Sequence, residues 1–376
     1  MVITNERHGS GSTAVELEDR SLQPIWDKVQ EGVRLTVADG VKLLESDDFV
    51  GIGRMANWAT ERISGRKVFF VINRHINYTN ICVLSCKFCD YAKKTGDDGA
   101  YEMKVEDVLS MMDDEIKEVH IVGGHHPSLP FQYYIDILSA IHTNHPDVHI
   151  KAFTAAEIDY FAKRWKVPPE ESLKRFKEVG LTTMPGGGAE VFASRVHKEL
   201  LPGKAKASRW LEIHRLAHKM GIRSNCTLLY GHIETLKERV EHLELLRELQ
   251  DETGGFLAFI PLEYQIGTTL LRPRHTPPLD DLKMISVARL FLDNIKYIKG
   301  YWVMIGEATA SISLNFGAND LDGTIGEERI AHAAQARSPV GVTRDRMVES
   351  ILDARRVPVE RDALYNERKV FDGVSA

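Results

Sequence analysis

The sequence predicts an α/β fold in which parallel strands form a barrel, open or closed. From residue 67 onward, short β-rich runs alternate with amphipathic segments of helical period, and parallel strands require such crossovers. Polar or glycine-rich clusters follow strand after strand, at residues 77–80, 123–126, 186–190 and 230–234. In a barrel these strand ends share one rim, whereas in a doubly wound sheet only those at the switch point meet. The repeated clusters therefore favour a barrel.

Short β-rich runs and helical periodicity place the elements of this region in order. The strands are predicted at residues 68–76, 119–122, 148–154, 181–184, 222–230, 256–262 and 301–305. The helices are predicted at residues 105–116, 131–145, 169–179, 207–220, 236–253 and 279–295. Gly180 and Gly221 directly follow two of these helices, where glycine commonly ends a helix.

The two ends of the chain are predicted to extend the barrel. Apolar residues at helical spacing predict helices within residues 21–65, and another helix is expected at 344–355. We therefore expect a leader and helical extension at residues 1–66, the barrel at 67–330 and a C-terminal extension at 331–376. Asp320 and Asp322 resemble the start of an EF-hand, but without its flanking helices they indicate a loop that closes the barrel.

The composition is that of a globular enzyme and excludes several classes of protein. With 48 Lys and Arg against 54 Asp and Glu, the formal net charge is −6, which gives no support for a nucleic-acid partner or an anionic membrane surface. Residues 1–20 lack an apolar core, so no secretory signal is expected. Glycines, prolines and adjacent histidines interrupt the longest uncharged segment, residues 119–135, which therefore predicts no transmembrane helix. We expect a cytoplasmic protein with no membrane or nucleic-acid partner.

The uneven placement of the four cysteines is the clearest functional signal. Cys82, Cys86 and Cys89 lie close together after the first strand, whereas Cys226 is expected to be a buried core residue of an apolar strand. Three soft thiolates on one loop suit an iron–sulfur cluster or zinc, and free thiols are the third alternative. A structural zinc site would need a fourth ligand, either Cys226 or a nearby histidine. A 4Fe–4S cluster held by three cysteines would leave one iron open to a small molecule.

The run CVLSCKFC at residues 82–89 resembles the CxxxCxφC motif of the radical S-adenosylmethionine (SAM) superfamily, in which φ is aromatic. The resemblance implies a partial (β/α)6 barrel related to the TIM barrel, with a 4Fe–4S cluster bound by Cys82, Cys86 and Cys89. It also implies that SAM chelates the open iron through its amino and carboxylate groups, with Phe88 near the adenine. The motif is specific for the superfamily and silent about the substrate.

More of the chain is similar to the aminodeoxyfutalosine synthase family, which acts in the futalosine route to menaquinone. The similar blocks occur in order between about residues 70 and 335: HINYTNICVLSCKFC, EVHIVGGHHPSLPF, HIKAFTAAEI, MPGGGAEVF, LLYGHIET, LQDETGGFLAFIPL and DLDGT. Two paralogous families share several of these blocks, namely the cyclic dehypoxanthine futalosine synthases and the deazaflavin synthase subunit. The segments GGHHP, MPGGGAE and FLAFIPLEY favour the aminodeoxyfutalosine enzymes.

The resemblance assigns further cofactor contacts to the strand ends. Gly123 and Gly124 match a turn whose backbone holds the amino group of SAM, although His125 stands where the family has glutamate. Glu190, at the end of the run GGGAE, is expected to accept hydrogen bonds from the ribose or to hold the methionyl amine.

Tyr78, in the polar run before the cysteines, is a further candidate for cofactor contact. Side chains alternate between the two faces of a strand, so His75 and Asn77 lie on the face opposite Tyr78. The pattern leaves open which of the two faces lines the site.

The implied substrate, 3-[(1-carboxyvinyl)oxy]benzoate, is an aromatic enol ether dicarboxylate, and arginine binds carboxylates best. Arg272 and Arg274 follow the sixth strand and are expected at the rim that carries the cysteines, whereas Arg223 begins a strand at the opposite rim. We assign Arg274 and His232 as catalytic candidates, Arg274 for a substrate carboxylate and His232 for proton transfer.

The chemistry implied by the resemblance begins with an external reductant, such as flavodoxin or ferredoxin. SAM is then split into methionine and a 5′-deoxyadenosyl radical, which adds to the enol ether. Rearrangement and loss of a carboxylate give 6-amino-6-deoxyfutalosine. Two alternatives remain. A paralogous enzyme would abstract hydrogen from its substrate instead. A protein outside this class would be a non-catalytic sensor that binds a metal through the three cysteines.

Overall fold

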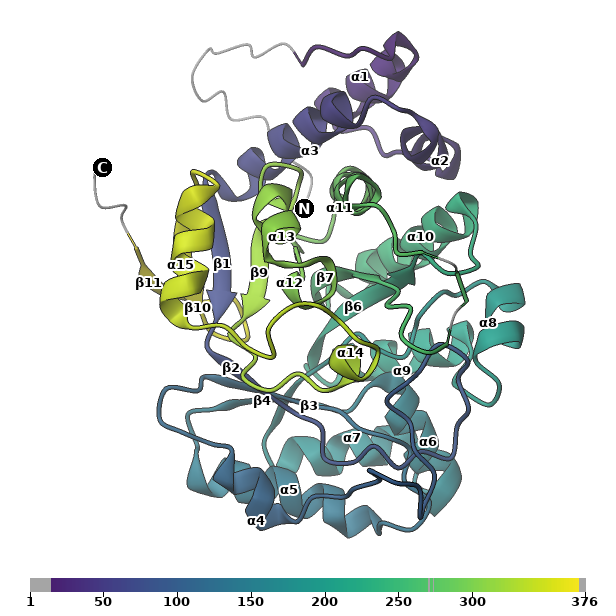
Figure 1. The fold of residues 1–376 in the computed structure, drawn as a ribbon, viewed down its shortest axis with the longest axis vertical. Coiled ribbons are helices and arrows are strands. Elements are labelled where there is room, and N and C mark those ends of the chain that lie inside the picture. Colours follow the sequence, from purple (N-terminus) through teal and green to yellow (C-terminus); the bar gives the residue numbers. More distant parts are fainter. Residues whose placement is uncertain (1–14, 270, 273, 372–376) are drawn as a thin grey trace.

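A curled sheet of seven parallel strands forms the centre of the molecule (Figure 1). The computed structural model describes residues 15–269, 271–272 and 274–371, and its strands follow the chain in order across the sheet. They are β2 (Asn73–Ile76), β3 (Glu118–Ile121), β4 (His149–Ala152), β5 (Leu181–Met184), β6 (Arg223–Tyr230), β7 (Phe256–Glu263) and β8 (Tyr297–Ile298). Every neighbouring pair is parallel. The predicted partial barrel is therefore confirmed.

A second sheet joins the first at both of its edges. Its order is β11 (Glu367–Val370), β10 (Val357–Arg361), β1 (Lys67–Val71) and β9 (Asp320–Gly323). Only Ile72 separates β1 from β2, and a parallel bridge links Lys299, just after β8, to Asp320. Parallel pairing of β1 with β9 and β10 brings the C-terminal segment against the first strand. The segment around Asp320 is thus a strand, and not the closing loop that we predicted.

Helices alternate along the chain with the strands of the seven-stranded sheet. They are α4 (Val105–Ser110), α5 (Phe131–Asn144), α6 (Ala155–Trp165), α7 (Pro169–Glu178), α8 (Ser194–Leu200), α9 (Ala207–Lys219), α10 (Leu236–Thr253) and α11 (Pro278–Phe291). Of these, α7, α9, α10 and α11 pack directly on the sheet. Two of them start at a capping box, in which Thr154 and Thr235 exchange hydrogen bonds with Glu157 and Glu238, respectively. The six predicted helices are confirmed, although α4 ends earlier than expected; α6 and α8 are additional.

The first and last helices lie outside this layer. A short 3-10 turn, η1 (Arg20–Leu22), leads into α1 (Gln23–Glu31), α2 (Val37–Glu45) and α3 (Phe49–Ser64). Helix α2 packs on α10 and α3 on α11, at one end of the molecule (Figure 1). The C-terminal region adds α12 (Trp302–Ile305), α13 (Glu307–Ser313), α14 (Ile330–Ala333) and α15 (Arg344–Asp353). These elements confirm the predicted helices within 21–65 and at 344–355.

The predicted strand at 301–305 is wrong, because this segment is the single-turn helix α12 and the neighbouring strand is β8. Both sides of the segment are buried, as Trp302, Val303 and Ile305 show. A short apolar run that is buried on all sides has no period by which a strand could be distinguished from a helix.

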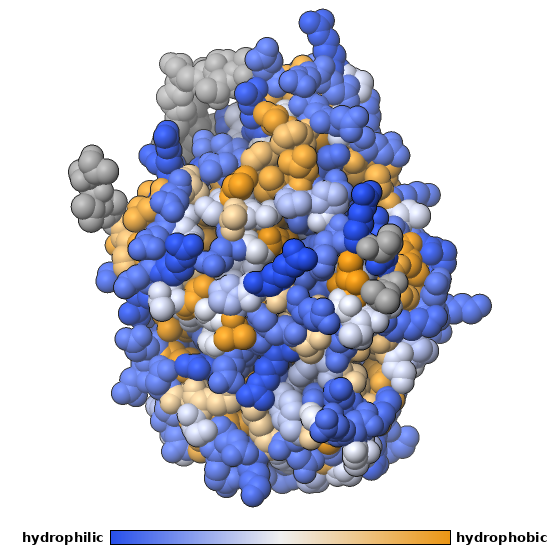
Figure 2. All heavy atoms as spheres, viewed as in Figure 1, coloured by the Kyte–Doolittle hydropathy of each residue, from blue (hydrophilic) through white to orange (hydrophobic). Residues whose placement is uncertain are grey.

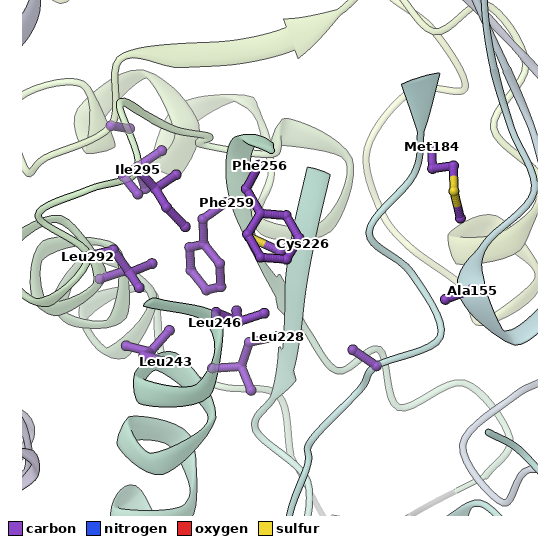
Figure 3. Close-up of a cluster of buried hydrophobic side chains, with 14 of the residues drawn as sticks. Ala155, Met184, Cys226, Leu228, Leu243, Leu246, Phe256, Phe259, Leu292 and Ile295 are labelled. Atoms are coloured by element: carbon purple, nitrogen blue, oxygen red, sulfur yellow. The ribbon is translucent and has the colours of Figure 1, made fainter. Parts of the chain in front are cut away.

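Cys226 belongs to the hydrophobic core, as predicted. It is fully buried in β6, and its Sγ donates to the carbonyl oxygen of Ala258 at 3.6 Å. Figure 3 shows it beside Phe256 and Phe259 of β7, with Leu243 and Leu246 of α10 and Leu292 after α11 nearby. The fourth cysteine therefore packs as a small apolar residue between the sheet and its helices.

The face of the molecule seen in Figure 2 is mixed, with hydrophobic side chains between hydrophilic ones. Hydrophilic residues cover most of the face in Figure 2. No helix in the described part of the chain is long and apolar enough to span a bilayer.

Candidate active site

One cavity of about 310 Å3 lies at the carboxyl ends of the strands. The loop after β2, the turn after β3, the start of α6 and residues 185–190 after β5 form much of its wall. The ends of β6 and β7 and the C-terminal residues 322–334 complete it. Three of the four predicted clusters, at residues 77–80, 123–126 and 186–190, thus contribute to one site, whereas no residue from 230 to 234 lines the cavity.

The three clustered cysteines all line this cavity. Cys82 is buried, whereas Cys86 and Cys89 are half-buried. Lys94 braces their loop, because its Nζ donates to the carbonyl oxygens of Cys82 at 3.0 Å and of Leu84 at 2.7 Å. The backbone of Cys89 donates to the carbonyl oxygen of Cys86 at 3.1 Å. These bonds fix the loop with its thiols toward the cavity.

The three thiols of this loop are a donor set that fits an iron–sulfur cluster. Burial raises the pKa of Cys86 to about 11 and also raises the pKa of Cys89, so metal binding would displace their protons. Three cysteines of one loop that line the same cavity suit a 4Fe–4S cluster, in which each thiolate binds a different iron.

The turn after β3 presses against the backbone that leads to Cys82. A Cβ at Gly124 would lie 2.3 Å from the carbonyl oxygen of Ile81. Gly123 N donates to Glu157 Oε1 at 3.1 Å, and Gly124 N donates to a backbone carbonyl oxygen at 2.8 Å. Both N–H groups of this turn are therefore used within the protein.

An ion pair lies beside the cysteines, at the end of the cavity that we call the outer end. Lys204 Nζ donates to Glu190 Oε1 at 2.6 Å and lies 5.4 Å from the centre of the Phe88 ring. Burial disfavours the charge on Lys204, but the Glu190 carboxylate holds its pKa above the usual value. The chain reaches Glu190 through Gly186, at which a Cβ would lie 2.6 Å from Cys226 Cα. Glycine is therefore required where the segment after β5 crosses β6.

Comparison with known proteins identifies the family. A model of the radical SAM superfamily matches residues 76–246, and a model described as the CofH/MqnC C-terminal region matches residues 253–374. The chain is 46% identical to an aminodeoxyfutalosine synthase of Thermus thermophilus over 369 residues, which cover 96% of this chain and 99% of that protein. This chain belongs to the radical SAM superfamily. Proteins of this superfamily use a 4Fe–4S cluster and SAM.

Other relatives of this radical SAM protein differ in name. An aminodeoxyfutalosine synthase of Streptomyces coelicolor is 39% identical, with 92% of this chain and 94% of that protein covered. A 5-amino-6-(D-ribitylamino)uracil–L-tyrosine 4-hydroxyphenyl transferase of Methanopyrus kandleri is 36% identical, with 91% and 98% covered. The crystal structure of methylornithine synthase has the same fold, with a TM-score of 0.67, 19% identity and coverage of 88% of this chain and 94% of that chain.

The cavity brings together most of the residues that were predicted for the cofactor site. Besides the cysteines, these are Phe88, Gly123, Gly124 and Glu190, all of which line the cavity. His125 also lines it, stacked on Tyr160 at 4.8 Å, and burial lowers its pKa to about 3. A neutral imidazole therefore stands where the family has a glutamate.

The structure places Tyr78 outside the cavity, behind the residues that line it. Its side chain is fully buried, and its hydroxyl donates to Glu157 Oε1 at 2.8 Å. His75 and Asn77, on the other face of the chain, line the cavity instead. Tyr78 supports the site from behind, because its ring would lie 2.7 Å from a Cβ at Gly123.

Neither catalytic candidate reaches the cavity. After β6 the chain turns at Gly231, so that His232 Nε2 lies 3.0 Å from the carbonyl oxygen of Leu229 and Nδ1 lies 3.0 Å from Glu234 Oε2. Both ring nitrogens of His232 are thus engaged within its own turn. Arg274 is exposed on the connection between β7 and α11, and the cavity wall does not include it. The prediction placed both residues near the correct strand ends but could not supply the direction of their side chains.

Sequence reasoning missed three residues of the site. Glu157 lines the cavity and could have been found from the capping-box pattern Thr154-x-x-Glu157. His120 lines it as well and is the register partner of His75. Lys204 has no comparable signal, since only the fold brings it to Glu190.

Proposed function

We propose that this chain is an aminodeoxyfutalosine synthase of menaquinone biosynthesis. It joins the 5′-deoxyadenosyl unit of SAM to 3-[(1-carboxyvinyl)oxy]benzoate, and rearrangement with loss of one carboxylate as CO2 or bicarbonate gives 6-amino-6-deoxyfutalosine. The observation that carries this proposal is 46% identity to a protein of that name over almost the whole of both chains. The cysteine-lined cavity provides a site for the reaction.

The residues at the outer end of the cavity hold the cofactors in this proposal. Cys82, Cys86 and Cys89 bind three irons of the cluster, so that the fourth can bind SAM. A bound cluster would supply the electron that splits SAM into methionine and a 5′-deoxyadenosyl radical. Phe88 lies beside the adenine, and Glu190 accepts hydrogen bonds from the ribose or holds the methionyl amine.

The apolar part of the cavity wall suits the substrate ring and excludes water. Leu229, Ile260, Leu262 and Met304 line this part. Such a wall orients the double bond toward the radical carbon and keeps competing hydrogen donors away. An external one-electron donor, such as flavodoxin or ferredoxin, completes the cytoplasmic system.

The proposed reaction can be tested with the reconstituted protein. After anaerobic reconstitution, the protein is incubated with SAM, dithionite and 3-[(1-carboxyvinyl)oxy]benzoate, and the products are analysed by mass spectrometry. An adduct that contains both the adenine and the benzoate is expected. Free 5′-deoxyadenosine as the stoichiometric product, with no adduct, would exclude the proposal.

Two cysteine variants serve as matched controls. Cys86→Ala is expected to lose the absorbance near 400 nm and the adduct, whereas Cys226→Ala keeps both because Cys226 lies in the core. A protein that binds zinc in place of about four irons would be a metal-binding sensor and not an enzyme of this class.

A paralogous activity is the second candidate. The match of residues 253–374 to the CofH/MqnC C-terminal region favours it, as does 36% identity to the tyrosine 4-hydroxyphenyl transferase. Such an enzyme, or a cyclic dehypoxanthine futalosine synthase, would abstract hydrogen from its own substrate. Turnover of those substrates in place of the enol ether would identify it.

A further inference from the structure

Two histidines from neighbouring strands line the inner end of the cavity. His75 of β2 and His120 of β3 are register partners, and their rings pack edge to face with centres 4.5 Å apart. Both line the cavity. His120 precedes Gly123 by three residues, so it lies about 10 Å further inside along the strand than the turn beside the cysteines.

One imidazole nitrogen at the inner end has no hydrogen-bond partner among the described residues. It is Nε2 of His75, which is buried. Three carboxylates lie near His75, and each has a partner: Asp322 pairs with Lys299, Glu328 with His332 at 2.9 Å, and Glu118 with Lys151. A buried imidazole nitrogen without a partner is unfavourable unless a ligand or water completes its hydrogen bond.

Cationic side chains are scarce around the cavity. Among the described residues that line it, Lys204 is the only lysine or arginine, and it is paired with Glu190 at the outer end. Further inside, Lys151 of β4 is the register partner of His120 and is buried with Glu118, with 2.7 Å between Nζ and Oε1. That pair carries no net charge, so hydrogen-bond donors have to hold any anion that binds here.

We propose that His75 and His120 bind the ring carboxylate of the substrate at the inner end of the cavity. This inference rests on the proposed function. In that reaction the enol double bond must lie next to the 5′-deoxyadenosyl group, beside the cysteines, and the ring carboxylate lies at the opposite end of the substrate. A buried carboxylate must be hydrogen-bonded, and its bonds to N–H donors are charge-assisted and strong.

The proposal is tested by binding to the unreduced holoenzyme in the presence of SAM, measured anaerobically by calorimetry. Three ligands are compared: the substrate, the analogue without the ring carboxylate, and the analogue without the enol-ether carboxylate. The protein variants are His75→Leu, His75→Gln and His120→Gln, of which the glutamine variants keep an N–H donor. Iron content, and the formation of 5′-deoxyadenosine from SAM and dithionite in the absence of substrate, establish that each variant retains its cofactor site.

The wild type is expected to lose at least about tenfold in affinity when the ring carboxylate is removed. The affinity of His75→Leu for the substrate should fall by a similar factor. Its affinity for the analogue without the ring carboxylate should equal that of the wild type. His75→Gln and His120→Gln should lose less than His75→Leu, because they retain a donor.

Two results would overturn the carboxylate site. One is equal binding of the substrate and the analogue without the ring carboxylate to the wild type, which requires no variant to fold. The other is an equal loss of affinity for both ligands in His75→Leu. If either result is found but the wild type forms the adduct that contains adenine and benzoate, the carboxylate site is wrong and the proposed function stands. If the wild type neither binds the substrate nor forms the adduct, the proposed function itself fails.

Discussion

The hydroxyl of Tyr78 and the backbone of Gly123 donate to the same carboxylate oxygen, Glu157 Oε1, at 2.8 and 3.1 Å. The other oxygen accepts from Thr154 N and Oγ1, at 2.7 and 2.8 Å. Burial raises the pKa of Glu157, and these hydrogen bonds oppose that effect by stabilising its charged form. One buried carboxylate thus connects the end of β2, the turn after β3 and the start of α6.

We expect Tyr78→Phe to weaken SAM binding without loss of iron. The change removes one of the hydrogen bonds to Glu157 and loosens the turn at Gly123. It should lower the free energy of unfolding by about 1.5–3 kcal/mol, the usual value of a hydrogen bond to a charged group. Denaturant unfolding, SAM titration and iron analysis measure the three quantities.

Tyr133→Phe is the matched control for this prediction. The Tyr133 hydroxyl donates to the carbonyl oxygen of Met103 at 2.6 Å, away from Glu157. We expect a loss of about 0.5–1.5 kcal/mol in stability with unchanged SAM affinity. Equal effects of the two variants on SAM affinity would contradict the role of Tyr78.

Gly124→Ala should impair assembly of the cluster. Its Cβ would lie 2.3 Å from Ile81 O and 3.1 Å from Cys82 Cβ, so the backbone that carries the first cysteine has to shift. Overpacking of this kind costs about 1–3 kcal/mol. We expect fewer irons per chain and a weaker absorbance near 400 nm after reconstitution.

Gly32→Ala provides the comparison for Gly124→Ala. Gly32 lies after α1 with φ +69°, and no atom lies within 4 Å of a Cβ built there. The left-handed backbone lowers stability by about 1 kcal/mol, but the iron content should remain that of the wild type. Iron loss in both variants would indicate a general effect of destabilisation.

Arg361→Met should be strongly destabilising. Arg361 and Asp320 are almost completely buried, with 2.7 Å between Nε and Oδ2. Removal of one partner of a buried ion pair costs about 3–5 kcal/mol because the other charge remains unpaired. Addition of Asp320→Asn should restore part of the loss, as measured by denaturant unfolding. Additive losses in the double variant would refute the coupling.

The stability of the protein should fall as the pH is lowered below about 6.5, and His242 should contribute to this fall. Burial lowers its pKa to about 3, against about 6.5 in an unfolded chain. Between these values the unfolded chain binds a proton that the folded protein does not, so each pH unit downward costs about 1.4 kcal/mol. Stability from this residue is complete above pH 6.5 and is lost toward pH 3.

His242→Gln should reduce that slope. The glutamine can still donate to the carbonyl oxygen of Thr227, as His242 Nε2 does at 2.8 Å. Unfolding midpoints of the wild type and the variant, measured between pH 4 and 8, should therefore run parallel above pH 7 and converge below it. Parallel curves over the whole range would show that His242 is not the titrating group.

The sequence was sufficient to predict the strand ends, because glycine and polar residues interrupt apolar runs there. It could not orient individual side chains. For Tyr78 the alternation of faces left two possibilities, and only the register between β2 and β3 places His75 and Asn77 inside. The direction of the His232 side chain is set by the turn at Gly231, which brings the ring back to the carbonyl oxygen of Leu229.

Contacts between distant parts of the chain could not be predicted from the local sequence pattern. Strand β10 is short and pairs with β1, and neither segment indicates the other. Lys204 meets Glu190 only after α8 and its connection have folded. Glu157 is different, since its capping-box pattern is local and visible in the sequence.

The pairing of β1 with β10 has a consequence for biosynthesis. Lys67 in β1 and Glu367 in β11 form an ion pair although they are 300 residues apart in the chain. Contacts between such distant segments form late, since a long loop must close first. During translation, the cysteine loop is therefore made long before β9, β10 and residues 322–334 complete the cavity wall. Insertion of the cluster into a finished site has to follow synthesis of nearly the whole chain.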